Sequence, residues 1–256
     1  GTPPLALMAR WGRTTDIEWV YEFTAQKGRI VKESYQGVLH KVMPFAGIRK
    51  FGAHPVLKVA SNNNNFSDIP AVSLLYNMVP HYVDLSSATR ESVADANPWI
   101  YRVMAQELKR EEHISNQSDL DPNLIGDPND YIYIDLYVEH QNGTTLACEV
   151  KLKGVEKLYR SDFADPRLRI DRDGFFRMAI RLPARALQGS TLSSIESISV
   201  SAFAKEEIST TRAFAINVKV LKAIFIDSQS LKLRSVKAIS QEPVTINAGE
   251  SKMFSF

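Results

Sequence analysis

The stretch YIYIDLYVEHQNGTTLACEVKLK, residues 131–153, decides the expected fold. Apolar residues occupy the even positions on both sides of residues 141–143, a period of two that is typical of β-strands with one buried face. A three-residue loop ending at Gly143 pairs His140 with Thr144 and places both apolar rows on one surface. The stretch therefore predicts an antiparallel hairpin with this buried row: Ile132, Ile134, Leu136, Val138, Leu146, Cys148, Val150 and Leu152.

The other face of the predicted hairpin carries Tyr131, Tyr133 and Tyr137, here named the tyrosine stripe. A stripe of this kind is either a binding platform or the floor of a second buried layer. The same register places Asp135 opposite Glu149, and like charges across a sheet are unfavourable unless a cation or a raised pKa relieves them. The stripe and the two carboxylates are therefore candidate ligand-binding residues, with relief of the charge pair by a nearby lysine as the structural alternative.

Most of the remaining chain also alternates with period two. Residues 176–182, 198–203 and 214–225 read as strands, and a change of phase near Val220 indicates a β-bulge. Residues 16–23 are the clearest strand before residue 130, and one helix is expected at 98–113, where Asn97 and Pro98 favour a helix start. We predict a mostly β protein, an antiparallel β-sandwich or jelly roll, as one or two adjoining sandwiches with this one packed helix.

The polar segment 116–130, rich in Asp and Pro, is the best candidate for a domain boundary. We expect an N-terminal β domain with the helix over residues 1–120 and a C-terminal sandwich over 121–256, unless the two form one continuous domain.

Composition narrows the classes of function. The 31 basic and 29 acidic residues give a net charge of +2 and form no long basic block, so we expect no nucleic-acid partner. No stretch reaches the ~20 apolar residues of a membrane-spanning helix. The single Cys148 lies in the apolar row and is expected to be a buried thiol. The first residue is Gly1 rather than Met, which indicates either a removed leader or a residue introduced by cloning, and we expect a secreted or periplasmic protein.

Asp16 and Glu18 are the candidate catalytic residues. On a strand they project from one face about 7 Å apart, a spacing that suits two carboxylates acting on a glycosidic bond. Residues 14–19, Thr-Thr-Asp-Ile-Glu-Trp, resemble the end of the active strand in concanavalin-like glycoside hydrolases of the laminarinase and lichenase type. The resemblance implies an assisting Asp at Asp16 and an acid/base at Glu18, but Thr14 stands where that family has its nucleophilic Glu.

The sequence offers no convincing metal site. Asp162, Asp165, Asp171 and Asp173 supply oxygen ligands that suit calcium, but no twelve-residue calcium loop follows, and neighbouring arginines at 160, 167, 169 and 172 can neutralise them. None of the five histidines has the spacing of a zinc helix, and no nucleotide or serine-elbow motif is present. We therefore expect no metal and no cofactor.

Three functions remain open. The leading hypothesis is recognition of a polysaccharide or oligosaccharide on the tyrosine stripe. The second is a glycoside hydrolase or lyase that uses Asp16 and Glu18 with a third acid, Asp135 or Glu149. The third is an envelope or assembly protein whose tyrosine stripe contacts a protein partner.

Overall fold

The computed structural model describes the whole chain except residues 1, 15–16, 70–72, 79, 87–88, 116–120, 142, 184–193, 206–214, 227–232, 240–241 and 256. The chain is mostly β, as predicted, with antiparallel sheets and few helices. It divides into two compact units, which are described separately. One spans Asp16–Tyr82, and the other combines Thr2–Thr15 with Val83–Phe256.

The smaller unit contains one antiparallel sheet and two short ribbons. Strands β1 (Tyr21–Gln26), β2 (Arg29–Gln36) and β3 (Val42–Pro44) form the sheet, in the order β1-β2-β3. A 3₁₀ turn, Val38–His40, joins β2 to β3. The ribbons pair β4 (Arg49–Lys50) with β5 (His54–Pro55) and β6 (Lys58–Val59) with β7 (Phe66–Ser67).

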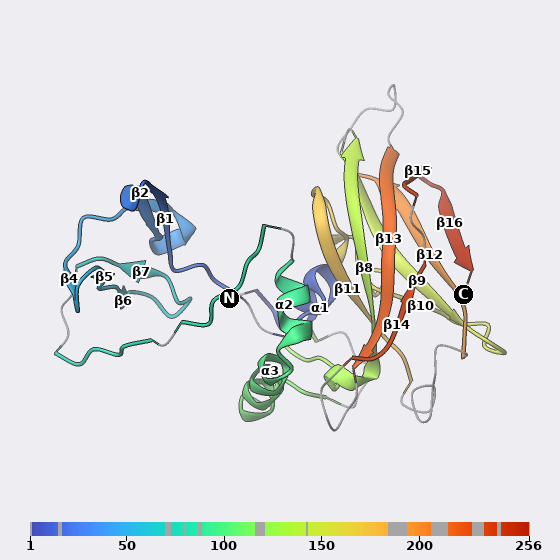
Figure 1. Ribbon diagram of the computed structural model, residues 1–256. Helices are drawn as coiled ribbons and strands as arrows, with labels where there is room; N and C mark the ends of the chain where they lie inside the picture. Colours follow the sequence, from blue (N-terminus) through green and yellow to red (C-terminus); the bar gives the residue numbers. More distant parts are fainter. Residues whose placement is uncertain are drawn as a thin grey trace. The chain divides into compact units, whose positions relative to one another are not determined.

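The larger unit is built on two antiparallel sheets (Figure 1). The first sheet has the order β11-β8-β13-β14, from Gly174–Arg181, Tyr131–Gln141, Ala215–Ile226 and Leu233–Ala238, and β15 (Val244–Asn247) also pairs with β13. The second sheet has the order β10-β9-β12-β16, from Leu158–Arg160, Thr144–Leu152, Ile195–Ala204 and Ser251–Ser255. Two 3₁₀ turns, Pro128–Asp130 and Pro166–Leu168, precede β8 and β11.

The core of this sandwich consists of the side chains that the two sheets direct toward each other. All eight apolar residues at the even positions of β8 and β9 belong to it. Residues from β11, β12, β13, β15 and β16 complete it, among them Met178, Val200, Val218, Ile246 and Phe254. The period-two pattern therefore predicted the buried face of both strands correctly.

The predicted hairpin pairing of β8 with β9 is wrong. Val138 is paired with Gly174 of β11 and Val218 of β13, whereas Leu146 is paired with Ala202 of β12. Strand β8 ends at Gln141 in the first sheet and β9 begins at Thr144 in the second, with Gly143 before β9 at a φ of 71°. Two apolar rows in the same phase face each other equally well as neighbours in one sheet or across a sandwich, so alternation does not distinguish the two arrangements.

The irregularity expected near Val220 is confirmed. Strand β13 pairs Val220 with Leu136 and Lys222 with Asp135, so two residues of β13 advance the register by one residue of β8. A bulge of this kind re-aims the side chains that follow it. It brings Lys222 onto the outer face of the first sheet, beside Asp135.

Three helices lie on the outer face of the first sheet: α1 (Pro4–Trp11), α2 (Arg90–Ala96) and α3 (Trp99–Arg110) (Figure 1). The expected helix is α3, with Pro98 as its N-cap residue. The other two were not predicted, because each is only two turns long. Local caps bound them. Gly12 adopts a left-handed conformation at the C-terminus of α1, and Thr89 and Ser92 form a capping box at the N-terminus of α2.

The boundary between the two units lies earlier in the chain than the sequence suggested. It falls between Tyr82 and Val83 rather than near residue 120, because α2 and α3 belong to the sandwich unit. Leu108 of α3 packs in one cluster with Leu5 of α1 and Ile224 of β13. This cluster forms a second buried layer between the helices and the first sheet.

Candidate functional site

Two members of the tyrosine stripe lie in this second layer. Tyr131 and Tyr133 are 1% and 2% exposed and pack with Met8, Leu108 and Ile125. The hydroxyl of Tyr131 accepts a hydrogen bond from the backbone N–H of Gly126 at 2.9 Å, and that of Tyr133 donates to the carbonyl of Pro128 at 2.7 Å. Burial raises the pKa of Tyr131 to about 12. Neither phenol is accessible to a polysaccharide.

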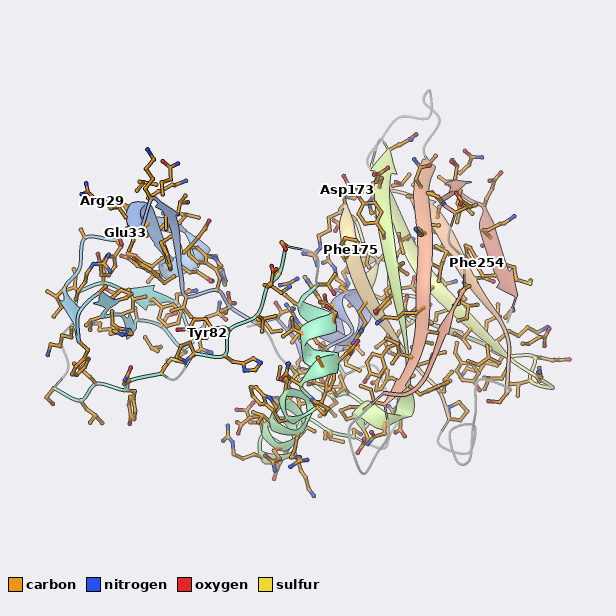
Figure 2. All side chains as sticks on the ribbon, in the orientation of Figure 1. Arg29, Glu33, Tyr82, Asp173, Phe175 and Phe254 are labelled. Carbon is orange, nitrogen blue, oxygen red and sulfur yellow. The ribbon has the colours of Figure 1, made fainter. Side chains whose placement is uncertain are left out.

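Tyr137 is the member of the stripe that stays at the surface. Its ring lies edge-on to Phe175, with the centroids 4.9 Å apart, and Phe175 is 56% exposed at the β11 edge of the first sheet (Figure 2). The Tyr137 hydroxyl donates to the carboxylate of Glu139 at 3.2 Å. The accessible aromatic surface of this face is therefore the Tyr137–Phe175 pair rather than a stripe of three tyrosines.

Asp135 does not lie opposite Glu149, so that predicted charge pair is wrong. Its register partners are Arg177 of β11 and Lys222 of β13. The Arg177 guanidinium binds it through two bonds, Nε to Oδ1 at 2.6 Å and Nη2 to Oδ2 at 2.9 Å. Glu149 points from the other sheet and pairs with Arg160 at 2.9 Å. The two carboxylates therefore lie on opposite outer faces of the sandwich and cannot act on one ligand.

The same guanidinium binds the helices. Its Nη1 and Nη2 atoms each lie 2.8 Å from a carboxylate oxygen of Asp95 in α2, and Nη1 also donates to the Tyr101 hydroxyl of α3 at 2.9 Å. Tyr101 in turn donates to Asp95 at 2.6 Å, and the Lys222 ammonium lies 3.4 Å from both aspartates. We call these five residues, Asp95, Tyr101, Asp135, Arg177 and Lys222, the Arg177 network.

The Arg177 network contains two carboxylates and two cations, so its formal charges cancel. Burial by itself would raise the pKa of Asp95, but the hydrogen bonds and charge of Arg177, with help from Tyr101 and Lys222, hold that pKa below its usual value. Arg177 is 2% exposed. A buried arginine with bidentate partners on both sides fixes geometry strongly, and here it joins two helices to the sheet.

An open cleft of about 580 Å³ lies beside the Arg177 network. Its wall combines apolar, hydroxyl and charged side chains, a composition that suits a small polar ligand with an apolar face. The lining residues are Leu85, Ser86, Thr89, Glu91, Ser92, Asp135, Leu136, Phe175, Phe176 and Lys222. Of the predicted ligand-binding residues, the structure places Asp135 in this cleft.

The predicted catalytic pair is not brought to this cleft. Asp16 lies outside the described residues, and Glu18 belongs to the smaller unit, where it pairs with His40 at 3.5 Å and accepts a hydrogen bond from Gln36. The strand expected at 16–23 begins only at Tyr21. Its pairing with β2 likewise begins at the Tyr21–Tyr35 pair.

The aspartates of the 162–173 region have protein partners. Asp162 is fully buried and accepts hydrogen bonds from Arg160 and Arg169 at 2.9 and 3.0 Å. The other three aspartates are paired as well: Asp165 with Arg167, Asp171 with both Arg10 and Lys205, and Asp173 with His140. Over the part of the chain that the structure describes, no group of three or more His, Cys, Asp or Glu side chains is arranged to hold a metal ion.

Sequence reasoning missed the Arg177 network because its members are far apart in the chain. The usable signal was Arg177 itself, a charged residue at an outward position in the middle of an apolar strand, which requires a partner when buried. Nothing in the alternation identifies Asp95 as that partner.

Comparison with known proteins yields no match, whether with protein-family models, with curated proteins or with solved structures. Among the described helices, none has both the length and the apolar character needed to cross a membrane.

Proposed function

We propose that this chain is an assembly protein that associates with a second copy of itself through the smaller unit, Asp16–Tyr82. The observation behind this proposal is the distribution of apolar side chains. Among the described residues of that unit, the buried hydrophobic residues are Tyr35, Phe45 and Val56. A much larger set of big apolar side chains is exposed: Ile17, Trp19, Val20, Phe23, Ile30, Val31, Val38, Leu39, Val42, Met43, Ile48, Phe51, Val59, Ile69, Leu74, Tyr76, Met78 and Tyr82.

The three-stranded sheet itself carries exposed apolar residues. Phe23 of β1 is 56% exposed, and Ile30 and Val31 of β2 are 42% and 55% exposed at the bulge where the β1–β2 register shifts. A unit that exposes so many large apolar side chains and buries so few favours an interaction surface. Covering it with protein removes apolar area from water and stabilises the assembly.

A second copy is favoured as the partner because strand β1 leaves one edge of its sheet unpaired among the described strands. Natural edges are usually blocked by proline, lysine or a bulge, whereas β1 has the sequence YEFTAQ, with neither proline nor lysine. Two β1 edges can pair antiparallel about a twofold axis, which continues the sheet across the interface.

Sedimentation velocity of the full chain over a range of concentrations tests this function. We expect a dimer or larger assembly, and Phe23→Lys, which charges a 56% exposed position on β1, shifts it toward monomer. The matched control is Leu158→Lys, at a 49% exposed position of the sandwich unit, which leaves assembly intact. A monomer at every concentration that also fails to bind an apolar dye contradicts the proposal.

Saccharide recognition is a second candidate, narrowed from the tyrosine stripe to the Tyr137–Phe175 pair and the adjoining cleft. An exposed aromatic ring beside hydroxyl and charged groups supports it, because sugars present both apolar faces and hydroxyls. Affinity electrophoresis through polysaccharide gels tests it. Retention that is lost in Phe175→Ala and kept in the control Met253→Ala supports it, and no retention on any polysaccharide contradicts it.

We do not propose a hydrolase. Glu18 is paired with His40 and Gln36, and the two acids considered as its helpers, Asp135 and Glu149, are each bound to an arginine.

A further inference from the structure

Three arginines surround the ring of Trp11 at the end of α1. The Arg172 guanidinium carbon lies 4.2 Å from the Trp11 ring centroid, and those of Arg10 and Arg13 lie 5.1 and 5.9 Å away. Arg172 also lies 5.3 Å from the ring of Phe176. Although Arg172 is exposed, partial desolvation, followed by the charges of Arg10, Arg90 and Arg13, lowers its pKa, and the charge of Asp171 opposes this effect. The cluster therefore holds like charges close together.

A cavity of about 210 Å³ opens onto this cluster. Water occupies roughly 30 Å³ per molecule in the liquid, so the cavity has room for a compact ion or the charged group of a larger ligand. It shares Glu91, Phe175 and Phe176 with the larger cleft. Its walls are Trp11, Arg90, Glu91, Arg172, Asp173, Phe175, Phe176 and Arg177.

Two of the three arginines that line the cavity have no counter-ion. Arg177 is bound to Asp95 and Asp135, whereas neither Arg90 nor Arg172 forms an ion pair with any residue that the structure describes. Arg10 lies outside the lining and is paired with Asp171 at 2.7 Å.

Two carboxylates also face the cavity and must be counted. Asp173 accepts hydrogen bonds from the backbone N–H of His140 at 2.6 Å and pairs with its ring at 3.1 Å, so its charge is partly engaged. Glu91 forms no ion pair with any residue that the structure describes, and its charge opposes an anion. The cavity lining therefore offers two unpaired guanidinium groups to an anion, opposed by the carboxylates of Glu91 and Asp173.

We propose that the Trp11–Arg172 cavity binds an oxyanion, either free or as the carboxylate, sulfate or phosphate group of a small ligand. Planar guanidinium groups bind such oxygens through paired hydrogen bonds, and the Arg172 guanidinium lies over the Trp11 ring. The site is separate from the proposed self-association surface, which belongs to the other unit.

Isothermal titration calorimetry with sodium acetate, sulfate and phosphate at constant ionic strength tests the proposal and distinguishes the three oxyanion classes. We expect saturable binding of at least one anion, weakened about tenfold or more in Arg172→Gln. Glu91→Gln, which removes the opposing charge, strengthens binding severalfold. The control Arg167→Gln alters an exposed arginine paired with Asp165 and leaves binding unchanged.

Arg90→Gln provides a second variant at an exposed position if Arg172→Gln fails to fold, as judged by circular dichroism, and it is expected to weaken binding in the same way. Three results would overturn the proposal: no saturable binding of any of the three anions, equal binding by the wild type and both cavity variants, or an equal loss in Arg167→Gln. The outcome does not depend on self-association, which the sedimentation experiment measures independently.

Discussion

Arg177 and Asp135 face each other on neighbouring strands of the first sheet and are joined by two charge-assisted hydrogen bonds of 2.6 and 2.9 Å. Through the same guanidinium, Asp95 and Tyr101 bind the helices to that sheet. The pair is therefore one point at which the helical layer and the sandwich are joined by polar contacts.

Removing the shared arginine is expected to destabilise the larger unit severely. Arg177→Met leaves Asp95 and Asp135 buried with Lys222 as their remaining cation, and breaking a buried ion pair in this way costs about 3–5 kcal/mol. Urea unfolding followed by circular dichroism measures the change. Arg167→Met, at an exposed arginine, is the control and is expected to change stability little; an equally small effect of Arg177→Met would contradict the role assigned to the Arg177 network.

Stability is expected to fall in acid partly through Asp95. Its folded pKa lies below that of the unfolded chain, so its contribution is complete above about pH 4, the unfolded value, and is lost as the pH falls through the folded pKa. Asp95→Asn should lower the melting temperature at pH 7 and flatten its decline toward pH 3. The exposed substitution Glu156→Gln should keep the wild-type pH dependence. An unchanged acid slope in Asp95→Asn would disprove the linkage.

The buried tyrosines are expected to ionise at a higher pH than exposed tyrosines. Burial raises the pKa of Tyr131 to about 12 and that of Tyr133 well above its ordinary value. Because the folded pKa is raised, the stability that these phenols contribute is complete below about pH 10 and is lost as the pH rises through the folded values. Absorbance at 295 nm should show tyrosines that ionise only as the protein unfolds. Full ionisation of every tyrosine near pH 10 in the folded state would contradict the covered stripe.

Tyr133 is expected to be a stability residue. Tyr133→Phe removes the hydrogen bond to Pro128 and should cost about 1 kcal/mol, whereas Tyr133→Ala also opens a cavity and should cost about 3–5 kcal/mol. Denaturant unfolding gives both values. Tyr137→Ala is the matched control at the surface, and we expect it to perturb stability less than Tyr133→Ala. A larger loss of stability in Tyr137→Ala than in Tyr133→Ala would contradict the burial of Tyr133 between the helices and the first sheet.

Period-two alternation specifies which side chains of a strand point into the core, and for β8 and β9 the core-facing residues were predicted correctly. Ile134 and Cys148 were assigned to the core, and both are fully buried between the sheets. The change of phase at Val220 predicted the bulge because a strand with one buried face shows an inserted residue directly in its pattern.

The candidate site was predicted only in part. Asp135 was identified through an unfavourable neighbour, Glu149, that it does not have, and Asp16 with Glu18 through a short resemblance. Arg172 was expected to neutralise an aspartate and instead lies on Trp11, more than 160 residues earlier in the chain. Such contacts depend on where a helix packs against the sheet, which the local sequence pattern does not predict.

The sequence by itself determined that the eight apolar side chains at the even positions of residues 131–153 are buried, because burial follows the chemistry of each side chain and its phase along the strand. Only the tertiary structure decided that β8 and β9 belong to different sheets, that the helices cover Tyr131 and Tyr133, and that Arg177 rather than Glu149 faces Asp135. The physical reason is that backbone hydrogen bonds are the same for every strand pair, so the partners of a strand are selected by the packing of the whole sandwich.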